Sequence, residues 1–218
     1  MKQLTGLIVF ILFVSIASGQ GTMELEDRLF VVNEKRVEKI DEYLDQFVFI
    51  NNLDKEEQEL FYWVNVLRAN PGLFLEKYVR PFLEQFPEAR GGASRSLISD
   101  LKNQPSLPLM EPRKDLSDIS RKHTRDLAIN TNGISHSSSD GKSFAQRMAA
   151  EGITCAGENI LIGKSDALKA IILLLIDEGV ANRGHRKALL NSGFNLIGVS
   201  IYPRKDGQYI LDQLFSCK

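Results

Sequence analysis

The chain has 218 residues, of which 43% are hydrophobic and 25% are charged, and its formal net charge is −1. This composition is typical of a globular protein and excludes collagen-like, coiled-coil and intrinsically disordered chains. A chain so close to neutrality has no general electrostatic attraction for phosphate backbones, so we expect it to bind no nucleic acid.

The first nineteen residues have the pattern of a secretory signal peptide. Lys2 supplies a short basic start, residues 4–16 are apolar, and Ala17 to Gly19 presents small side chains where a signal peptidase cuts. We expect cleavage after Gly19 and secretion to the extracellular space. The alternative, a membrane anchor, needs a longer apolar stretch than this one, so we expect no transmembrane segment in the mature chain.

Cys155 and Cys217 are the only cysteines in the chain. An exported protein meets an oxidising compartment, which favours a disulfide between them, and the alternative is a pair of buried free thiols. Two cysteines are too few for a zinc knuckle, so a metal site would need histidines and carboxylates.

The first half of the chain is predicted to be helical. Residues 20–53 form a helical N-terminal extension, because apolar side chains recur there at helical spacing. A clearer helix begins at Asp54, which forms a capping box with Glu57, and it ends at Asn70. Residues 90–96 are rich in Gly, Ser and Arg and are predicted to be a surface loop.

The second half of the chain combines helices with strands. Helices are predicted over 115–129 and 144–150. A third helix follows a cap at Ser165, and its stretch 170–176 is so apolar that it must be buried nearly all round. The predicted strands are 158–163, 197–202 and 208–215, the last two joined by a hairpin turn at Asp206-Gly207. This order predicts one α+β domain with helices on both faces of a small sheet.

A few side chains stand out as able to carry chemistry. His136 lies in a polar loop, His185 precedes an apolar helical turn, and Glu158 opens an otherwise apolar strand. Two imidazoles and a carboxylate suit a divalent cation or acid–base work. The residues alone also allow these groups to be scattered over the surface.

Three further residues have a more structural interpretation. His123 lies on the apolar face of its helix and is predicted to be a hydrogen-bonded packing residue. Asp177 and Glu178 end the apolar helix where the helix dipole disfavours a carboxylate, so another group should compensate them. The absence of a Gly-x-Ser-x-Gly elbow, a His-Glu-x-x-His motif and a P-loop pattern from the sequence gives nucleophilic catalysis little support.

Five motifs occur in an order that is specific when they are taken together. The core pair is Gly157-Glu158-Asn159-Ile160 followed by Gly184-His185-Arg186. The supporting segments are Val66 to Pro71, Leu107 to Leu109 with Ser120 to His123, Ser135 to Gly141 with Arg147, and Ile176 to Val180. Residues 54–218 thereby resemble the CAP superfamily (cysteine-rich secretory proteins, antigen 5 and pathogenesis-related 1 proteins), also called the SCP domain, and are closest to its bacterial and protist variant.

The resemblance implies an α-β-α three-layer sandwich with a small antiparallel sheet. It also implies a surface cleft where two histidines and acidic residues meet, in several relatives around a divalent cation. Carried over to this chain, the ligands of a zinc-like ion are His136, His185 and Glu158. Asp177 and Glu178 are the candidates for a second cleft acid.

The resemblance further implies a secreted, monomeric protein whose activity is binding. Relatives bind sterols or other lipids, act in defence or host interaction, or have no assigned activity. We expect a non-enzymatic ligand- or partner-binding module whose extracellular partner is a lipid, a sterol or a protein. The alternative is a secreted metal-dependent, protease-like hydrolase that uses the same cleft, and a third possibility is a structural protein with a vestigial cleft. Arg186 departs from the Gly-His-Tyr pattern of animal and plant relatives.

Overall fold

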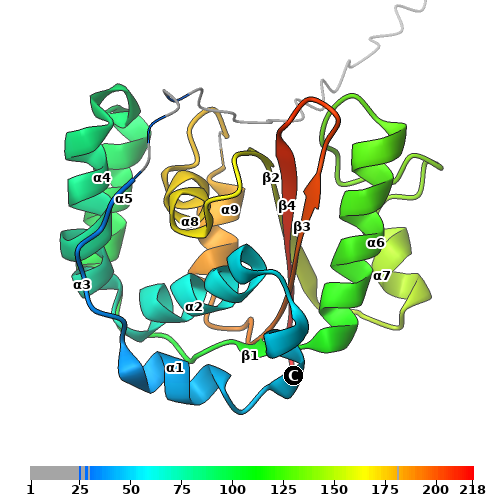
Figure 1. Cartoon of the computed structure of the whole chain (residues 1–218), viewed down its shortest axis with the longest axis horizontal. Coiled ribbons are helices and arrows are strands. Elements are labelled where there is room, and N and C mark those ends of the chain that lie inside the picture. The colour runs from blue at the N-terminus through cyan, green and yellow to red at the C-terminus, as the bar shows by residue number, and fades with distance from the viewer. Residues whose placement is uncertain (1–24, 26–27, 29, 181) are drawn as a thin grey trace, which may run out of the picture.

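The computed structural model describes residues 25, 28, 30–180 and 182–218. The predicted signal peptide and its cleavage point after Gly19 lie outside the described residues. Within them the chain is an α-β-α sandwich, with a sheet between two layers of helices, as the sequence predicts (Figure 1).

The middle layer is, within the described residues, a four-stranded sheet in the order β1-β3-β4-β2. Its strands are β1 (Glu111–Pro112), β2 (Ala156–Gly163), β3 (Leu196–Pro203) and β4 (Tyr209–Ser216). Strand β4 pairs antiparallel with both β2 and β3, whereas the short β1 pairs in parallel with β3. The predicted strands are confirmed to within two residues at each end. Strand β2, which carries Glu158, is an edge strand.

The helices divide between the two faces of the sheet (Figure 1). One face is covered by α6 (Lys114–Asn130) and α7 (Phe144–Ala150). The other is covered by α2 (Lys55–Ala69), α8 (Ala167–Ile176) and α9 (Gly184–Leu189). Beyond these lie α1 (Glu38–Leu44), α3 (Pro71–Phe74), α4 (Arg80–Gln85) and α5 (Gly92–Asn103), with single turns at Val48–Asn52, Leu75–Val79 and Pro87–Ala89.

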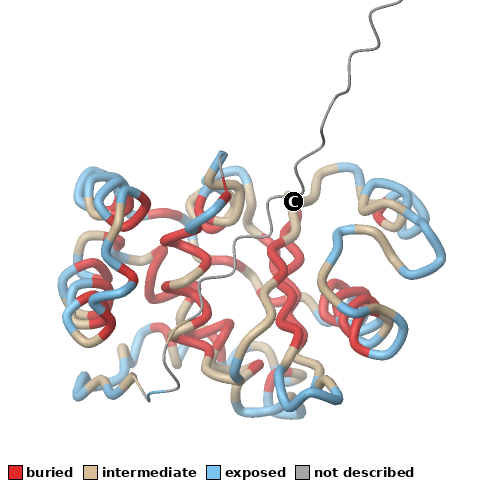
Figure 2. Tube along the Cα trace, turned by 90° about the horizontal axis from the view of Figure 1, so that it is seen from above, coloured by how far each residue is buried: buried red, intermediate tan, exposed pale blue. Residues whose placement is uncertain are grey.

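Buried residues lie along the sheet and on the inner sides of both helical layers (Figure 2). Helix α6 approaches β3 closely because position 198 is glycine. A Cβ on Gly198 would lie 2.2 Å from the carbonyl carbon of Leu116, which is far inside van der Waals contact. The main core also includes Ile40, Leu44 and Ile50, so the N-terminal extension contributes side chains to it.

The capping box at the start of α2 is present and does more than cap the helix. The Glu57 carboxylate accepts the Asp54 N–H at 3.3 Å. Although Glu57 is buried, it also accepts Arg121 of α6 at 2.9 Å and the N–H of Ile201 of β3 at 3.1 Å. One buried carboxylate therefore joins a helix from each layer to the sheet.

The prediction of a surface loop at residues 90–96 is wrong, because helix α5 begins at Gly92. Its buried side consists of Ala93, Leu97 and Leu101, which recur at helical spacing and contribute to the main core. The Gly and Ser residues gave the segment a loop-like composition, and tertiary packing decided against that weak local preference.

Cys155 and Cys217 form a disulfide with their Cα atoms 5.7 Å apart. The bridge joins the residue before β2 to the residue after β4, next to the paired residues Ala156 and Ser216. The pairing expected for an exported chain is confirmed, and the alternative of two free thiols is excluded.

Among the helices of the described residues, none combines the length and apolar character that crossing a bilayer requires.

Candidate functional site

His136 lies in the loop between α6 and α7, and Glu158 of β2 holds its ring. The His136 Nδ1 atom donates to Glu158 Oε2 at 2.8 Å. Arg147 of α7 donates to the other carboxylate oxygen at 2.5 Å and to the His136 carbonyl at 3.2 Å. The Glu158 side chain is 1% exposed. Both of its oxygens are engaged, so its contacts fix the orientation of His136.

His185 lies in the first turn of helix α9, and Asp177 holds its ring in the same way. The His185 Nδ1 atom donates to Asp177 Oδ1 at 2.7 Å. Asp177 Oδ2 accepts the backbone N–H groups of His185 at 3.0 Å and Arg186 at 3.3 Å. A carboxylate at the C-terminal end of α8 is therefore compensated by the first N–H groups of the next helix.

Of the two candidates for a second acid, Asp177 is the one that contacts a histidine. It adopts a left-handed conformation with φ 57°, which ends α8 and turns its buried side chain toward α9. Glu178 is exposed, and its Oε2 atom lies near Gly91, 3.5 Å from where a Cβ on that glycine would be. The backbone turn at Asp177, and not the residue type, decides which of these two neighbouring acids meets His185.

The Gly157-Glu158-Asn159 motif links the two histidines. Successive side chains of a strand point to opposite faces, so Glu158 faces α6 and α7 while Asn159 faces α9. Buried Asn159 donates to the His185 carbonyl at 3.3 Å and to Gln213 at 3.2 Å. A Cβ on Gly157 would lie 2.8 Å from the ring of Phe194. Each residue type in the motif is therefore required by a steric or polar contact of its own: Gly157 by the Phe194 ring, Glu158 by His136 and Asn159 by the His185 carbonyl.

The second ring nitrogen of each histidine is available. Within the described residues, Nε2 of neither His136 nor His185 has a hydrogen-bond partner, and the side chains are 56% and 16% exposed. A carboxylate on one ring nitrogen is the usual arrangement of a metal-binding histidine and also of a histidine that acts as a base. The two rings share no hydrogen bond among the described residues, and strand β2 is what connects them.

As far as the structure describes the chain, the two histidines lack a third protein ligand for a metal ion. In the part of the chain that the structure describes, no group of three or more His, Cys, Asp or Glu side chains is arranged to hold a metal ion. In the two histidine–carboxylate pairs, the atoms without a hydrogen-bond partner among the described residues are the two imidazole Nε2 atoms. Imidazole nitrogens suit zinc and neighbouring transition metals, whereas calcium and magnesium prefer oxygen.

Two buried titratable groups lie behind Glu158. His123 Nε2 lies 2.9 Å from the Ser135 carbonyl and 4.0 Å from Glu158 Oε2, and burial lowers the pKa of this histidine. It is a hydrogen-bonded packing residue, as predicted. Asp212 of β4 is 0% exposed, and its carboxylate has no hydrogen-bond partner among the described residues. Burial, followed by repulsion from Glu158, raises its pKa well above the usual range.

The sequence interpretation missed Asp212. An ionisable residue inside the predicted apolar strand 208–215 was the available signal, because a buried charge without a partner is costly.

Comparison with solved structures gives partial similarities. An extracellular protein containing a SCP domain from Bacillus anthracis str. Ames is 30% identical, with a TM-score of 0.40, over 57% of this chain and 38% of its own. This chain therefore spans well under half of that protein. An outer surface protein from Borrelia burgdorferi is 20% identical, with a TM-score of 0.44, over 51% of this chain and 80% of its own.

NaASP2, solved with Zn²⁺, is 16% identical, with a TM-score of 0.44, over 76% of this chain and 81% of its own. No curated protein matches the chain significantly. The model of the cysteine-rich secretory protein family, CAP, matches residues 63–218, which is most of the chain and includes both histidines and the acids that hold them. The chain belongs to the CAP family.

Proposed function

We propose that the chain is a secreted CAP-domain protein that binds an extracellular ligand or partner and holds a divalent cation between His136 and His185. The observation that carries this proposal is the matched pair of contacts in which Glu158 and Asp177 each hold the Nδ1 atom of one histidine. Secretion is proposed from the sequence pattern of residues 1–19.

The chemistry of these pairs favours a zinc-like ion. A histidine that donates Nδ1–H to a carboxylate presents the lone pair of Nε2, which is the form that binds metal. In this proposal Glu158 orients His136, because both of its oxygens are already engaged, and water completes the coordination. A bound ion would act as a Lewis acid toward a carboxylate or carbonyl of the ligand.

A metal-dependent hydrolase at the same residues is the second candidate. The observation that favours it is again the histidine–carboxylate pair, which is how a general base is commonly held. Catalytic zinc sites usually have three protein ligands, and the described residues offer two imidazoles. This donor set supports binding over catalysis.

The cation is tested by titration calorimetry with Zn²⁺ and Ca²⁺. We expect one Zn²⁺ per chain, no binding of Ca²⁺, and a loss of affinity of about tenfold or more in His136→Ala and in His185→Ala. Glu178→Gln is the matched control, because this exposed acid contacts neither histidine. Equal Zn²⁺ affinity in all four proteins would refute the proposed site.

Catalysis and ligand class need separate measurements. Zinc-loaded protein that cleaves members of a peptide and ester library, with cleavage lost in His136→Ala, would establish the hydrolase instead. For the ligand, organic extracts of protein purified from its natural secretion are analysed by mass spectrometry. A stoichiometric sterol or other lipid identifies a lipid carrier, and extracts free of lipid favour a protein partner.

A further inference from the structure

Arg186, the residue that departs from the Gly-His-Tyr pattern, crosses from α9 to α5. Its side chain is buried, and its guanidinium donates to five groups. These are the carbonyls of Leu175 at 2.6 Å, Ile176 at 2.9 Å and Ala93 at 2.9 Å, and the side chains of Ser96 and Asp100, both at 2.8 Å. Because every N–H is in use, Arg186 fixes the spacing of the two helices and has no donor left for a ligand.

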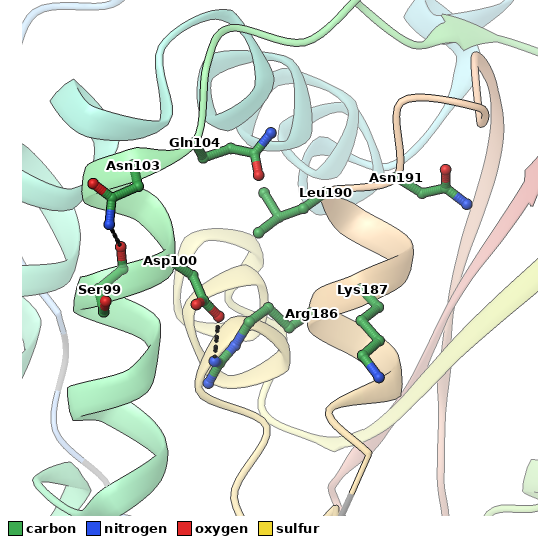
Figure 3. A pocket seen from close by; sticks show the side chains of 8 residues that line it. All are labelled: Ser99, Asp100, Asn103, Gln104, Arg186, Lys187, Leu190 and Asn191. Carbon is green, nitrogen blue, oxygen red and sulfur yellow. Dashed lines mark hydrogen bonds and ion pairs between the residues drawn. The ribbon is translucent and has the colours of Figure 1, made fainter.

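A groove of about 510 Å³ opens between these two helices above Arg186. Figure 3 shows Asp100, Asn103 and Gln104 on the α5 side and Leu190 facing them from the α9 side. The volume is within the range of small-molecule sites. Both walls are fixed to the core by Arg186, so the side chains are presented by rigid elements.

The polar groups of the groove keep unused hydrogen-bonding capacity. Asn103 uses only its amide nitrogen, on the Ser99 carbonyl at 2.9 Å, and Gln104 makes only a 3.4 Å contact to the next residue. Asp100 engages one of its two oxygens. Donors and acceptors therefore lie side by side in the groove.

This lining discriminates between classes of ligand. An anion would find no donor on Arg186, whose charge Asp100 already offsets, and the exposed ammonium of Lys187 is the single cation left among the described lining residues to attract it in a groove that also carries the Asp100 carboxylate. A lipid chain would have to desolvate three amides, a carboxylate and an ammonium against one apolar side chain, Leu190. A polyhydroxylated ligand suits both the neighbouring donors and acceptors and the single aliphatic side chain. Each of its hydroxyl groups donates and accepts a hydrogen bond, and its C–H face packs on Leu190.

We propose that the groove between α5 and α9 is a saccharide-binding site. It is separate from the histidine site, which none of its hydrogen-bonding residues contact through their side chains. This assignment does not depend on cation binding, so either proposal can fail without the other.

The test is an amide NMR titration of the full chain with three neutral trisaccharides, chitotriose, cellotriose and mannotriose. We expect at least one to give saturable shifts that are largest in residues 99–104 and 186–191. The double variant Asn103→Ala with Gln104→Ala should weaken the binding of that saccharide about fivefold or more, because the saccharide loses its hydrogen bonds to both side-chain amides. Asn130→Ala, an exposed amide on α6 beyond the sheet, is the matched control and should bind normally.

Three results would overturn the proposal. The first is no shift with any trisaccharide at about 10 mM, well above a weak Kd of about 1 mM. The second is undiminished affinity in the double variant. The third is that inorganic phosphate or decanoate, and no trisaccharide, shifts the groove residues. Saccharide binding that survives in His136→Ala shows that the two sites are independent.

Discussion

Glu158 and Asn159 are consecutive residues of strand β2, yet they hold opposite sides of the candidate site. Glu158 contacts the ring of His136 on the face of the sheet that α6 and α7 cover, and Asn159 donates to the backbone carbonyl of His185 on α9. The alternation of a β-strand thereby turns two neighbouring residues into the link between two distant loops. The position of one histidine relative to the other depends on this edge strand.

The buried ion pair between Glu158 and Arg147 should be essential for the stability of the fold. Glu158→Ala removes the partner of Arg147, whose side chain is itself largely buried. We expect the free energy of unfolding to fall by about 3–5 kcal/mol in urea titrations, because a buried charge is left unpaired. Glu151→Ala, which breaks the exposed 3.7 Å pair with Lys122, should change it by less than about 1 kcal/mol. Similar losses in the two variants would disprove a special role for Glu158.

Asp212 should make the protein less stable as the pH rises. Its pKa is raised in the folded state by burial and by Glu158, so the folded chain keeps a proton that the unfolded chain releases. Unfolded Asp ionises near pH 4, and above that pH the difference in bound protons favours the unfolded state.

Asp212→Asn should therefore be more stable than wild type at pH 7, and the advantage should vanish below about pH 4. Unfolding free energies measured between pH 3 and pH 8 check both points. Asp45→Asn is the control, because this aspartate is exposed. An advantage that is the same at every pH would show that shape, and not ionisation, is responsible.

The Cys155–Cys217 bridge should add substantial stability. It spans 62 positions of the chain, and closing a loop of that length in the unfolded state is worth about 4 kcal/mol in the chain-entropy model. We expect the double variant Cys155→Ser with Cys217→Ser to lose about this amount, measured by urea unfolding. Reduced wild type should match the variant. Two reactive thiols in denatured, unreduced protein would contradict the bridge.

The segment before α1 should be held by its aromatic contacts. The Phe30 ring lies 5.3 Å from Phe82 and 6.4 Å from Phe86, both edge-on, and the guanidinium of Arg28 lies 5.0 Å from the Phe86 ring. Phe30→Ala should lower the free energy of unfolding by about 1–2 kcal/mol and hasten tryptic cleavage at Lys35.

Val31→Ala is the control for Phe30, because the neighbouring valine side chain is exposed. Equal cleavage rates in the two variants, both close to wild type, would show that the aromatic contacts do not hold this segment.

Periodicity and turn residues predicted the sheet well. The alternating strand at 197–202 and the Asp206-Gly207 turn appear within one or two residues of their predicted places, because these signals are local. Helix α5 could not be predicted in the same way. Its start depends on Ala93 and Ser96 receiving hydrogen bonds from Arg186, a residue far away in the sequence.

The candidate site was predictable as a set of residues but not as a set of contacts. His136, His185 and Glu158 were identified by their motifs, whereas the engagement of Glu158 by Arg147 depends on how α7 packs. Which acid meets His185 is decided by the left-handed turn at Asp177. Such information appears only when the chain is folded.

The most direct test of the account is an anomalous difference map from crystals of the zinc-loaded protein, recorded at the zinc absorption edge. We predict one peak between the two rings, about 2.0–2.1 Å from Nε2 of both His136 and His185. Two separate peaks, or one peak bound by a single imidazole, would contradict a shared cation site.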